Sequence, residues 1–243
     1  MNSNDYKALR QFITDKRKYN VLIFSDTHVS VNSNFNLIRH AFDLEHDLAL
    51  HAGDLFNGFA NFGPSSTHDE YVEALNQFTH LTNNYPRDVG DTYFITGNHD
   101  LELSRVLKYN IGKAVSRARK NLIYMNAKTQ DIRINNCNIR LRHQIKIASV
   151  FQKSTIKTPK ALDDKNNIDV LAFGHRHEMS YAFVNNTAYL GLAALNHDIV
   201  DPDNGVWLLS LHFDSAHNME YISSTYYQAD NGKSKKLLKV KSF

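Results

Sequence analysis

The chain has a single cysteine, Cys137, among its 243 residues. One cysteine cannot form a disulfide bond within the chain, so the sequence carries no disulfide framework and is typical of a protein of a reducing interior. The chain is still long enough, and with 42% hydrophobic residues apolar enough, to bury a core without cross-links. We expect one large domain, with Cys137 as a small buried strand residue.

Long apolar runs are also missing from the sequence. Residues 1–20 alternate polar and charged side chains without an apolar stretch of signal-peptide length, and nothing later approaches the length of a membrane span. We therefore expect a soluble, cytoplasmic protein that makes no membrane contact.

The sequence has little net charge, +3 at pH 7 with histidine neutral. Its lysines cluster in residues 233–241, and such a segment could meet phosphate backbones, although short lysine runs are more often solvated termini. Internal repeats and long linkers are absent from the sequence as well. We predict a helical N-terminal extension over residues 1–20, a single domain over residues 21–228 and a basic C-terminal tail over residues 229–243.

The first half of the sequence alternates predicted strands and helices. The predicted strands cover residues 21–24, 48–50, 92–96 and 122–124, and the predicted helices cover residues 34–46, 71–81, 101–108 and 111–120. Thr67 and Glu70 have the spacing of a capping box before the second helix. From residue 131 onward, alternating patterns predict strand pairs with turns at Asn135-Asn136 and Asn185-Asn186. The order indicates an α/β fold with mixed sheets.

Polar side chains gather where the predicted strands end. They lie in Ser25-Asp26-Thr27-His28, Gly53-Asp54, Gly97-Asn98-His99-Asp100, His143 and Gly174-His175-Arg176-His177. Open α/β sheets keep their active sites at the carboxyl ends of their strands. Asp26 and His28 are two residues apart, so in an extended strand both side chains point the same way. The two oxygens of Asp54 could bridge two ions, and His51 is a candidate for a position beneath the site. The set predicts a pair of metal ions.

In order along the chain, these motifs resemble the D-x-H, G-D, G-N-H-[DE], lone His and G-H-x-H pattern of the calcineurin-like metallophosphoesterases. The resemblance covers about residues 20–213. It implies a four-layer αββα sandwich of two mixed β-sheets flanked by helices, with a dinuclear metal site where the strands end. It assigns one ion to Asp26, His28, Asp54 and His177, and the other to Asp54, Asn98, His143 and His175. His99 would be no ligand.

Imidazoles, carboxylates and an amide oxygen suit divalent transition metals, so Mn²⁺ is the first expectation, with Fe²⁺ or Zn²⁺ as alternatives. Two such ions lower the pKa of a bridging water and neutralise phosphoryl oxygens. The resemblance therefore implies hydrolysis of a phosphate ester by attack of a metal-bridged hydroxide, with His99 as the general acid for the leaving group. Asp100 could orient His99 or its loop. Arg105, Arg117 and Arg119 are candidates for binding substrate phosphate, although charged helical positions are usually solvated.

The residues around Asp54 argue against a serine/threonine protein phosphatase, because Asn57-Gly58 departs from the G-D-x-x-D-R-G of those enzymes. The nuclease and phosphodiesterase branch, and its compact phage and prokaryotic members, are more similar. Our first hypothesis is a phosphodiesterase acting on a nucleotide or similar small diester. The alternatives are an SbcD-like DNA or RNA nuclease, a phosphomonoesterase, and a non-catalytic metal-binding scaffold like the retromer subunit that shares the fold. Residues 58–66 are candidates for lining a substrate cleft, and the sequence names no protein partner.

Overall fold

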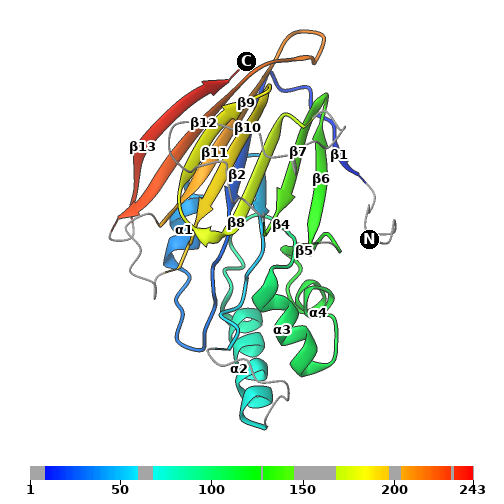
Figure 1. The fold of residues 1–243 in the computed structure, drawn as a ribbon, viewed down its shortest axis with the longest axis vertical. Helices are drawn as coiled ribbons and strands as arrows, with labels where there is room; N and C mark the ends of the chain where they lie inside the picture. The colour runs from blue at the N-terminus through cyan, green and yellow to red at the C-terminus, as the bar shows by residue number, and fades with distance from the viewer. Residues whose placement is uncertain are drawn as a thin grey trace.

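Two mixed β-sheets lie face to face, and helices cover one of them (Figure 1). The computed structural model describes residues 9–59, 68–126, 128–144, 168–196, 204–230 and 233–242. One sheet has six strands in the order β1-β6-β7-β8-β10-β9, and the other has seven in the order β13-β12-β11-β2-β3-β4-β5. The predicted α/β fold with two mixed sheets and helices is confirmed.

The elements follow one another along the chain as β1 (Arg10–Phe12), β2 (Lys18–Phe24), α1 (Asn36–Phe42), β3 (Leu48–His51), α2 (His68–Asn84), β4 (Thr92–Phe94), α3 (Asn98–Leu107), α4 (Ile111–Ala118), β5 (Leu122–Tyr124), β6 (Thr129–Ile134), β7 (Cys137–Arg142), β8 (Val170–His177), β9 (Ser180–Val184), β10 (Thr187–Ala193), β11 (Gly205–Phe213), β12 (Met219–Asp230) and β13 (Lys233–Ser242). Strands β2 to β5 are parallel neighbours, while β11, β12 and β13 are antiparallel. The predicted order of βαβ units followed by hairpins is therefore confirmed.

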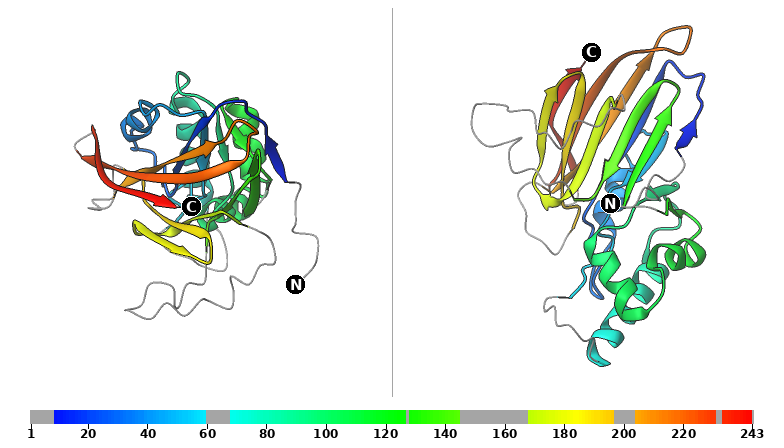
Figure 2. Two further views of the ribbon diagram at one scale, coloured as in Figure 1. Left: turned by 90° about the horizontal axis from the view of Figure 1, so that it is seen from above. Right: turned by 45° about the vertical axis from the view of Figure 1, so that its right-hand side comes forward.

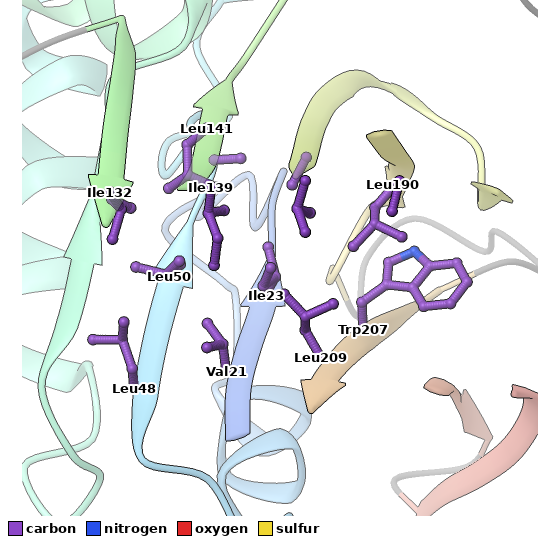
Figure 3. Packing of buried hydrophobic residues seen from close by; sticks show 14 of the residues in the cluster. Val21, Ile23, Leu48, Leu50, Ile132, Ile139, Leu141, Leu190, Trp207 and Leu209 are labelled. Carbon is purple, nitrogen blue, oxygen red and sulfur yellow. The ribbon is translucent and has the colours of Figure 1, made fainter. Parts of the chain in front are cut away.

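Strand β2 shows why the parallel strands are apolar throughout. Val21 and Ile23 face the space between the sheets, whereas Leu22 and Phe24 face the helices, and all four are fully buried. Figure 3 shows this inter-sheet core, in which side chains of β2, β3 and β11 meet those of β6, β7 and β10. Trp207 packs at its edge and donates its indole N–H to the carbonyl of Gly191 at 2.9 Å.

The four described helices cover the outer face of the seven-stranded sheet, as the view from above in Figure 2 shows. Ala74 and Leu81 of α2, Leu103 of α3 and Val115 of α4 pack there. On the outer face of the six-stranded sheet, a small cluster forms around Leu171, Phe173 and Tyr189. The helical layer that was predicted for this face has no counterpart among the described residues, which leave out residues 145–167 between β7 and β8.

The prediction of a helical extension over residues 1–20 is wrong for residues 9–20. Arg10–Phe12 forms β1, a parallel edge strand beside β6, and β2 already begins at Lys18 because it pairs with β11. The Phe12 ring packs edge-on against Tyr93 with ring centroids 5.4 Å apart. Strand pairing and this aromatic contact favour an extended chain over the helix. Residues 1–8 lie outside the described part of the chain.

The lysine-rich C-terminal segment is not a separate tail. Strand β12 runs to Asp230, and Lys233–Ser242 pairs with it antiparallel as β13, the edge of the seven-stranded sheet. The paired backbone explains why this polar sequence is extended, and lysine-rich edge strands resist pairing with other chains. The domain therefore includes this segment.

Several smaller predictions have clear outcomes. Cys137 lies in β7 with no exposed surface, as expected, and burial raises the pKa of its thiol. The Asn135-Asn136 and Asn185-Asn186 turns connect β6 to β7 and β9 to β10. Thr67 of the predicted capping box, and residues 60–66 of the predicted cleft loop, lie outside the described residues. No helix in the described ranges combines the length and apolarity that crossing a membrane requires.

Candidate metal centre

The predicted site residues lie at or just after the carboxyl ends of β2, β3, β4, β7 and β8, near the point where α3 begins (Figure 1). Backbone hydrogen bonds join the first two of these loops. The N–H of Asp26 donates to the carbonyl of Gly53 at 3.0 Å, and the N–H of His28 donates to the carbonyl of Asp54 at 3.2 Å. The two motifs are thus held side by side by the main chain.

A first ligand group consists of Asp26, His28 and His177. The Nε2 atoms of His28 and His177 are 2.9 Å apart, and they lie 3.6 Å and 3.3 Å from Oδ1 of Asp26. Asp26 has no exposed surface. Its burial raises the pKa, but hydrogen bonds from His177 and His28 outweigh that effect and hold the pKa below its usual value. Asp26 is therefore a charged carboxylate at neutral pH.

A second ligand group consists of Asp54, His143 and His175, with Asn98 against it. Nε2 of His143 lies 3.0 Å from Oδ2 of Asp54 and 3.1 Å from Oδ1 of Asn98. Nδ1 of the same ring lies 2.9 Å from the carbonyl oxygen of Ala52. A neutral His143 that donates to Ala52 therefore aims a lone pair at two further acceptors.

The acceptor atoms that meet around His143 show whether metal ions fit the site. Where Nε2 of His143 meets the oxygens of Asp54 and Asn98, a proton or a cation must lie between them. Without a cation the proton is held tightly: burial lowers the pKa of His143, but the hydrogen bond and charge of Asp54 outweigh it and raise the pKa to about 9. Imidazole, carboxylate and amide oxygen are also the donors that divalent transition metals take. The residues present fit such ions.

His99 lies beside both groups. Its backbone N–H donates to Oδ1 of Asp54 at 2.9 Å, and its Nε2 is 3.8 Å from Oδ2 of that residue. His28, Asp54 and His99 also form a third group of converging ligand atoms, so proximity by itself does not separate a ligand from a proton donor. Burial lowers the pKa of His99.

Glu102 lies behind His99, at the nitrogen that faces away from Asp54. Oε2 of Glu102 is 3.8 Å from Nδ1 of His99, and neither of these buried atoms has a hydrogen-bond partner. Burial, followed by the negative charge of Asp54, raises the pKa of Glu102 to about 7, although the Phe59 backbone N–H partly offsets this. Its position three residues after His99 is the one sequence feature that could have indicated a role for Glu102.

The backbone around the site is strained. Five of the seven predicted ligands have positive φ angles: Asp26 at 54°, His28 at 43°, Asp54 at 56°, His175 at 76° and His177 at 56°. Such angles are uncommon outside glycine and cluster at functional sites. The expected extended geometry of the D-x-H motif is therefore wrong. The side chains converge because the chain turns into the left-handed region at each of these residues.

Two glycines allow the loops around Asp54 to approach one another. Gly53 has a φ of +100°, and a Cβ at Gly97 would overlap the side chain and backbone of Asp54. Because only a glycine at position 97 leaves room for Asp54, the G-D and G-N-H-D motifs depend on each other.

The sequence left two roles open for Asp100, which could orient His99 or the loop that carries it. In the structure, Asp100 orients the loop. Its carboxylate is fully buried and accepts backbone N–H bonds from Gly97 at 2.8 Å, Asp54 at 3.0 Å and Phe56 at 3.1 Å. Burial, followed by the charge of Asp54, raises its pKa. Asp100 therefore fixes the Asp54 loop to the start of α3.

Replacing Asp100 with alanine should lower the free energy of unfolding by about 2–4 kcal/mol, because three buried N–H groups lose their acceptor. Urea denaturation of the metal-free protein measures this loss. Asp91→Ala, at an exposed position just before β4, is the matched control and should unfold as the wild type does. Equal urea midpoints for the two variants would show that Asp100 does not hold the loop.

His51 lies beneath the site, as the sequence suggested it could. It is fully buried, its Nδ1 accepts the N–H of Gly53 at 3.1 Å, and its Nε2 lies 3.2 Å from the hydroxyl of Thr27. Burial lowers the pKa of His51 to about 3, so the ring is neutral. Since Nδ1 accepts, Nε2 carries the proton and donates to Thr27, which in turn donates to the carbonyl of Leu55. His51 thus links the loops that follow β2 and β3.

A two-sheet α/β sandwich with converging metal-ligating residues at its strand ends defines a class of metal-dependent hydrolases. The family model of calcineurin-like phosphoesterases matches residues 19–179, more than half of the chain, and the chain belongs to this family. No curated protein sequence matches it. Membership of this family indicates a phosphoesterase. The family and the clusters of histidine and aspartate residues together support binding of divalent metal.

Solved structures share this fold at low sequence identity. Vacuolar Protein Sorting 29 from Cryptosporidium parvum is 14% identical with a TM-score of 0.53, over 94% of this chain and 100% of that one. A conserved protein of Streptococcus pneumoniae TIGR4 described as a predicted phosphoesterase is 13% identical with a TM-score of 0.47, over 90% and 97%. Yfce, a phosphoesterase from E. coli, is 14% identical with a TM-score of 0.45, over 84% and 97%. The likeness to Vacuolar Protein Sorting 29 concerns the fold alone.

Proposed function

We propose that the chain is a dinuclear metal-dependent phosphodiesterase. One observation carries the proposal: Asp54 belongs to the second ligand group, and its carboxylate also lies within 4.8 Å of a ring nitrogen of His28 in the first group, so two ions could share it. In this proposal Asp26, His28, Asp54 and His177 hold one ion, and Asp54, Asn98, His143 and His175 hold the other. Mn²⁺ is the first candidate, with Fe²⁺ and Zn²⁺ as alternatives, and a cytoplasmic location is part of the proposal.

Two divalent ions bound there would acidify a water molecule and neutralise charge on the phosphoryl oxygens. Hydrolysis of a phosphodiester joins a water oxygen to phosphorus and breaks the bond to the ester oxygen, which needs a proton as it leaves. His99 gives its proton to the departing oxygen, because its imidazole lies beside the ligand groups and its Nε2 faces Asp54. Glu102 acts through His99: its carboxylate lies 3.8 Å from Nδ1, beyond hydrogen-bond distance, and its negative charge favours a proton on that nitrogen.

The ester class is tested with a pair of chromogenic substrates. With Mn²⁺ present, we expect faster hydrolysis of bis-p-nitrophenyl phosphate than of p-nitrophenyl phosphate, compared as kcat/KM. Faster hydrolysis of the monoester would favour the phosphomonoesterase alternative instead. No turnover of either substrate with two ions bound would refute the enzyme and favour a non-catalytic scaffold, a hypothesis that the likeness to Vacuolar Protein Sorting 29 keeps open. Nuclease activity remains the second candidate for the diester reaction.

A further inference from the structure

A pocket of about 520 Å³ adjoins the second ligand group. Asn98 and His143 form part of its wall, so a group that fills the pocket lies directly beside the proposed metal centre. Its volume falls in the range of small-molecule sites. The reaction derived above uses none of the rest of this pocket, which extends past Tyr124 and Thr129.

The pocket is positively charged. Arg142 and Lys128 line it, and none of its lining residues in the described part of the chain is an aspartate or glutamate. The β6–β7 hairpin shows how this charge arises. Arg140 stands opposite Asp131, which accepts its guanidinium at 2.6 Å and 2.8 Å, whereas Arg142 stands opposite Thr129. Asp131 therefore neutralises the charge of Arg140 within the hairpin. The residue opposite Arg142 is Thr129, which carries a hydroxyl group instead of a carboxylate.

The remaining wall adds polar groups near the ligands. Tyr124 and Asn126 line the pocket, and so does Gln144, whose Nε2 lies 3.2 Å from Nε2 of His175. Gln144 therefore connects the pocket wall to the second ligand group. The pocket thus combines hydrogen-bonding side chains and two cationic side chains with Asn98 and His143 of the proposed metal centre.

We propose that this pocket is a second phosphate-binding site, in which Arg142 and Lys128 bind a phosphate that the substrate carries in addition to the one that reacts. A guanidinium presents a planar fork of donors that matches two phosphate oxygens, and a lysine adds a compact charge. The inference rests on the proposed function, because it names the substrate class of the same centre. That class is a phosphodiester with a second phosphate, either the next link of a nucleotide chain or the terminal phosphate of a small nucleotide.

Binding tests the site without turnover. Isothermal titration at one fixed salt concentration compares thymidine 3′,5′-bisphosphate with thymidine 5′-monophosphate. We expect the wild type to prefer the bisphosphate by roughly tenfold or more, as charge-assisted hydrogen bonds allow, and we expect Arg142→Gln to lose most of that preference. Lys128→Gln, at an exposed position, gives a second variant in case Arg142→Gln folds poorly by thermal denaturation.

Arg133→Gln is the matched control. Arg133 is an exposed arginine of the same hairpin, its guanidinium donates to the carbonyl of Asn135 at 2.9 Å, and it does not line the pocket. This variant should keep the full preference. Equal affinity of the wild type for the two nucleotides would overturn the proposal. An undiminished preference in both Arg142→Gln and Lys128→Gln would overturn it as well.

Turnover separates the two sources of the second phosphate. The p-nitrophenyl ester of thymidine 5′-phosphate is compared with the same ester carrying a 3′-phosphate or a 3′-phosphothymidine. A lower KM for the 3′-phosphate alone supports a small nucleotide, and a lower KM for both supports a nucleotide chain. A KM unchanged by either addition contradicts the site. No turnover of all three esters, with the binding preference intact, refutes the proposed hydrolase while supporting the second phosphate site.

Discussion

Asp54→Asn should weaken metal binding at least about a hundredfold and reduce phosphodiesterase turnover to near background. The substitution keeps the shape of the side chain and an oxygen for the His99 backbone N–H. It removes the negative charge and one of the two oxygens, which are the properties that allow one residue to serve two ions. Elemental analysis after gel filtration should find fewer than two Mn²⁺ per chain.

Asp43→Asn is the matched control, because it makes the same aspartate-to-asparagine change at an exposed position. Asp43 is exposed at the end of α1, where it lies 3.5 Å from His40, and it belongs to none of the ligand groups. It should retain two ions and full turnover. Two ions in Asp54→Asn, at the affinity of the wild type, would contradict the sharing of Asp54.

His99→Asn should lower kcat by about 10²- to 10⁴-fold on an alkyl diester, whose leaving oxygen needs a proton, and far less on a p-nitrophenyl diester. The metal content should not change, since the proposal gives His99 no ligand role. The wild-type rate on the alkyl ester should fall as pH rises and His99 loses its proton. That decline should disappear in the variant. Loss of an ion would instead make His99 a ligand, and equal losses on both esters would contradict its role as the proton donor.

Glu102→Gln tests the same proton donation by His99, at the residue that lies behind its Nδ1. It removes the charge behind Nδ1 of His99 and keeps the side-chain shape. We expect a smaller loss than for His99→Asn with the same dependence on the leaving group, because Glu102 acts only through the ring. A uniform loss on both esters would point to a structural effect, and Glu102→Asp should restore part of the activity if the charge is what matters.

The residues of the candidate site could be predicted from the sequence because their chemistry is tied to strand ends. Apolar runs such as residues 21–24 and 48–50 mark buried parallel strands, and the residues that follow them must meet at one edge of the sheet. His143 had no motif spacing to support it, yet the structure brings its Nε2 within 3.0 Å of Asp54. The prediction rested on the family resemblance and on its place at the end of a predicted strand, between Asn98 and the paired histidines.

The local backbone could not be predicted in the same way. The sequence suggested that Asp26 and His28 share a direction because a strand alternates, but both have positive φ and the strand ends at Phe24. Long-range pairing also decided the ends of the chain. Arg10–Phe12 and Lys18 became extended through partners more than a hundred residues away, and no local pattern records such partners.

The surroundings of the site were least visible in the sequence. Three arginines were considered as candidates for binding substrate phosphate. Arg105 and Arg117 are exposed on α3 and α4 and do not line the pocket beside the ligands, and Arg119 is buried outside it. Arg142 was missed, although it immediately precedes His143. The difference between Arg140 and Arg142 depends on which residue stands across the hairpin, and register appears only when two strands are paired.

Anomalous diffraction at the manganese edge, from crystals of the wild-type protein grown with Mn²⁺, tests the dinuclear centre most directly. We predict two peaks, one contacted by Asp26, His28 and His177 and the other by Asn98, His143 and His175, with Asp54 contacting both. A single peak, or two peaks that share no contact with Asp54, would contradict the account.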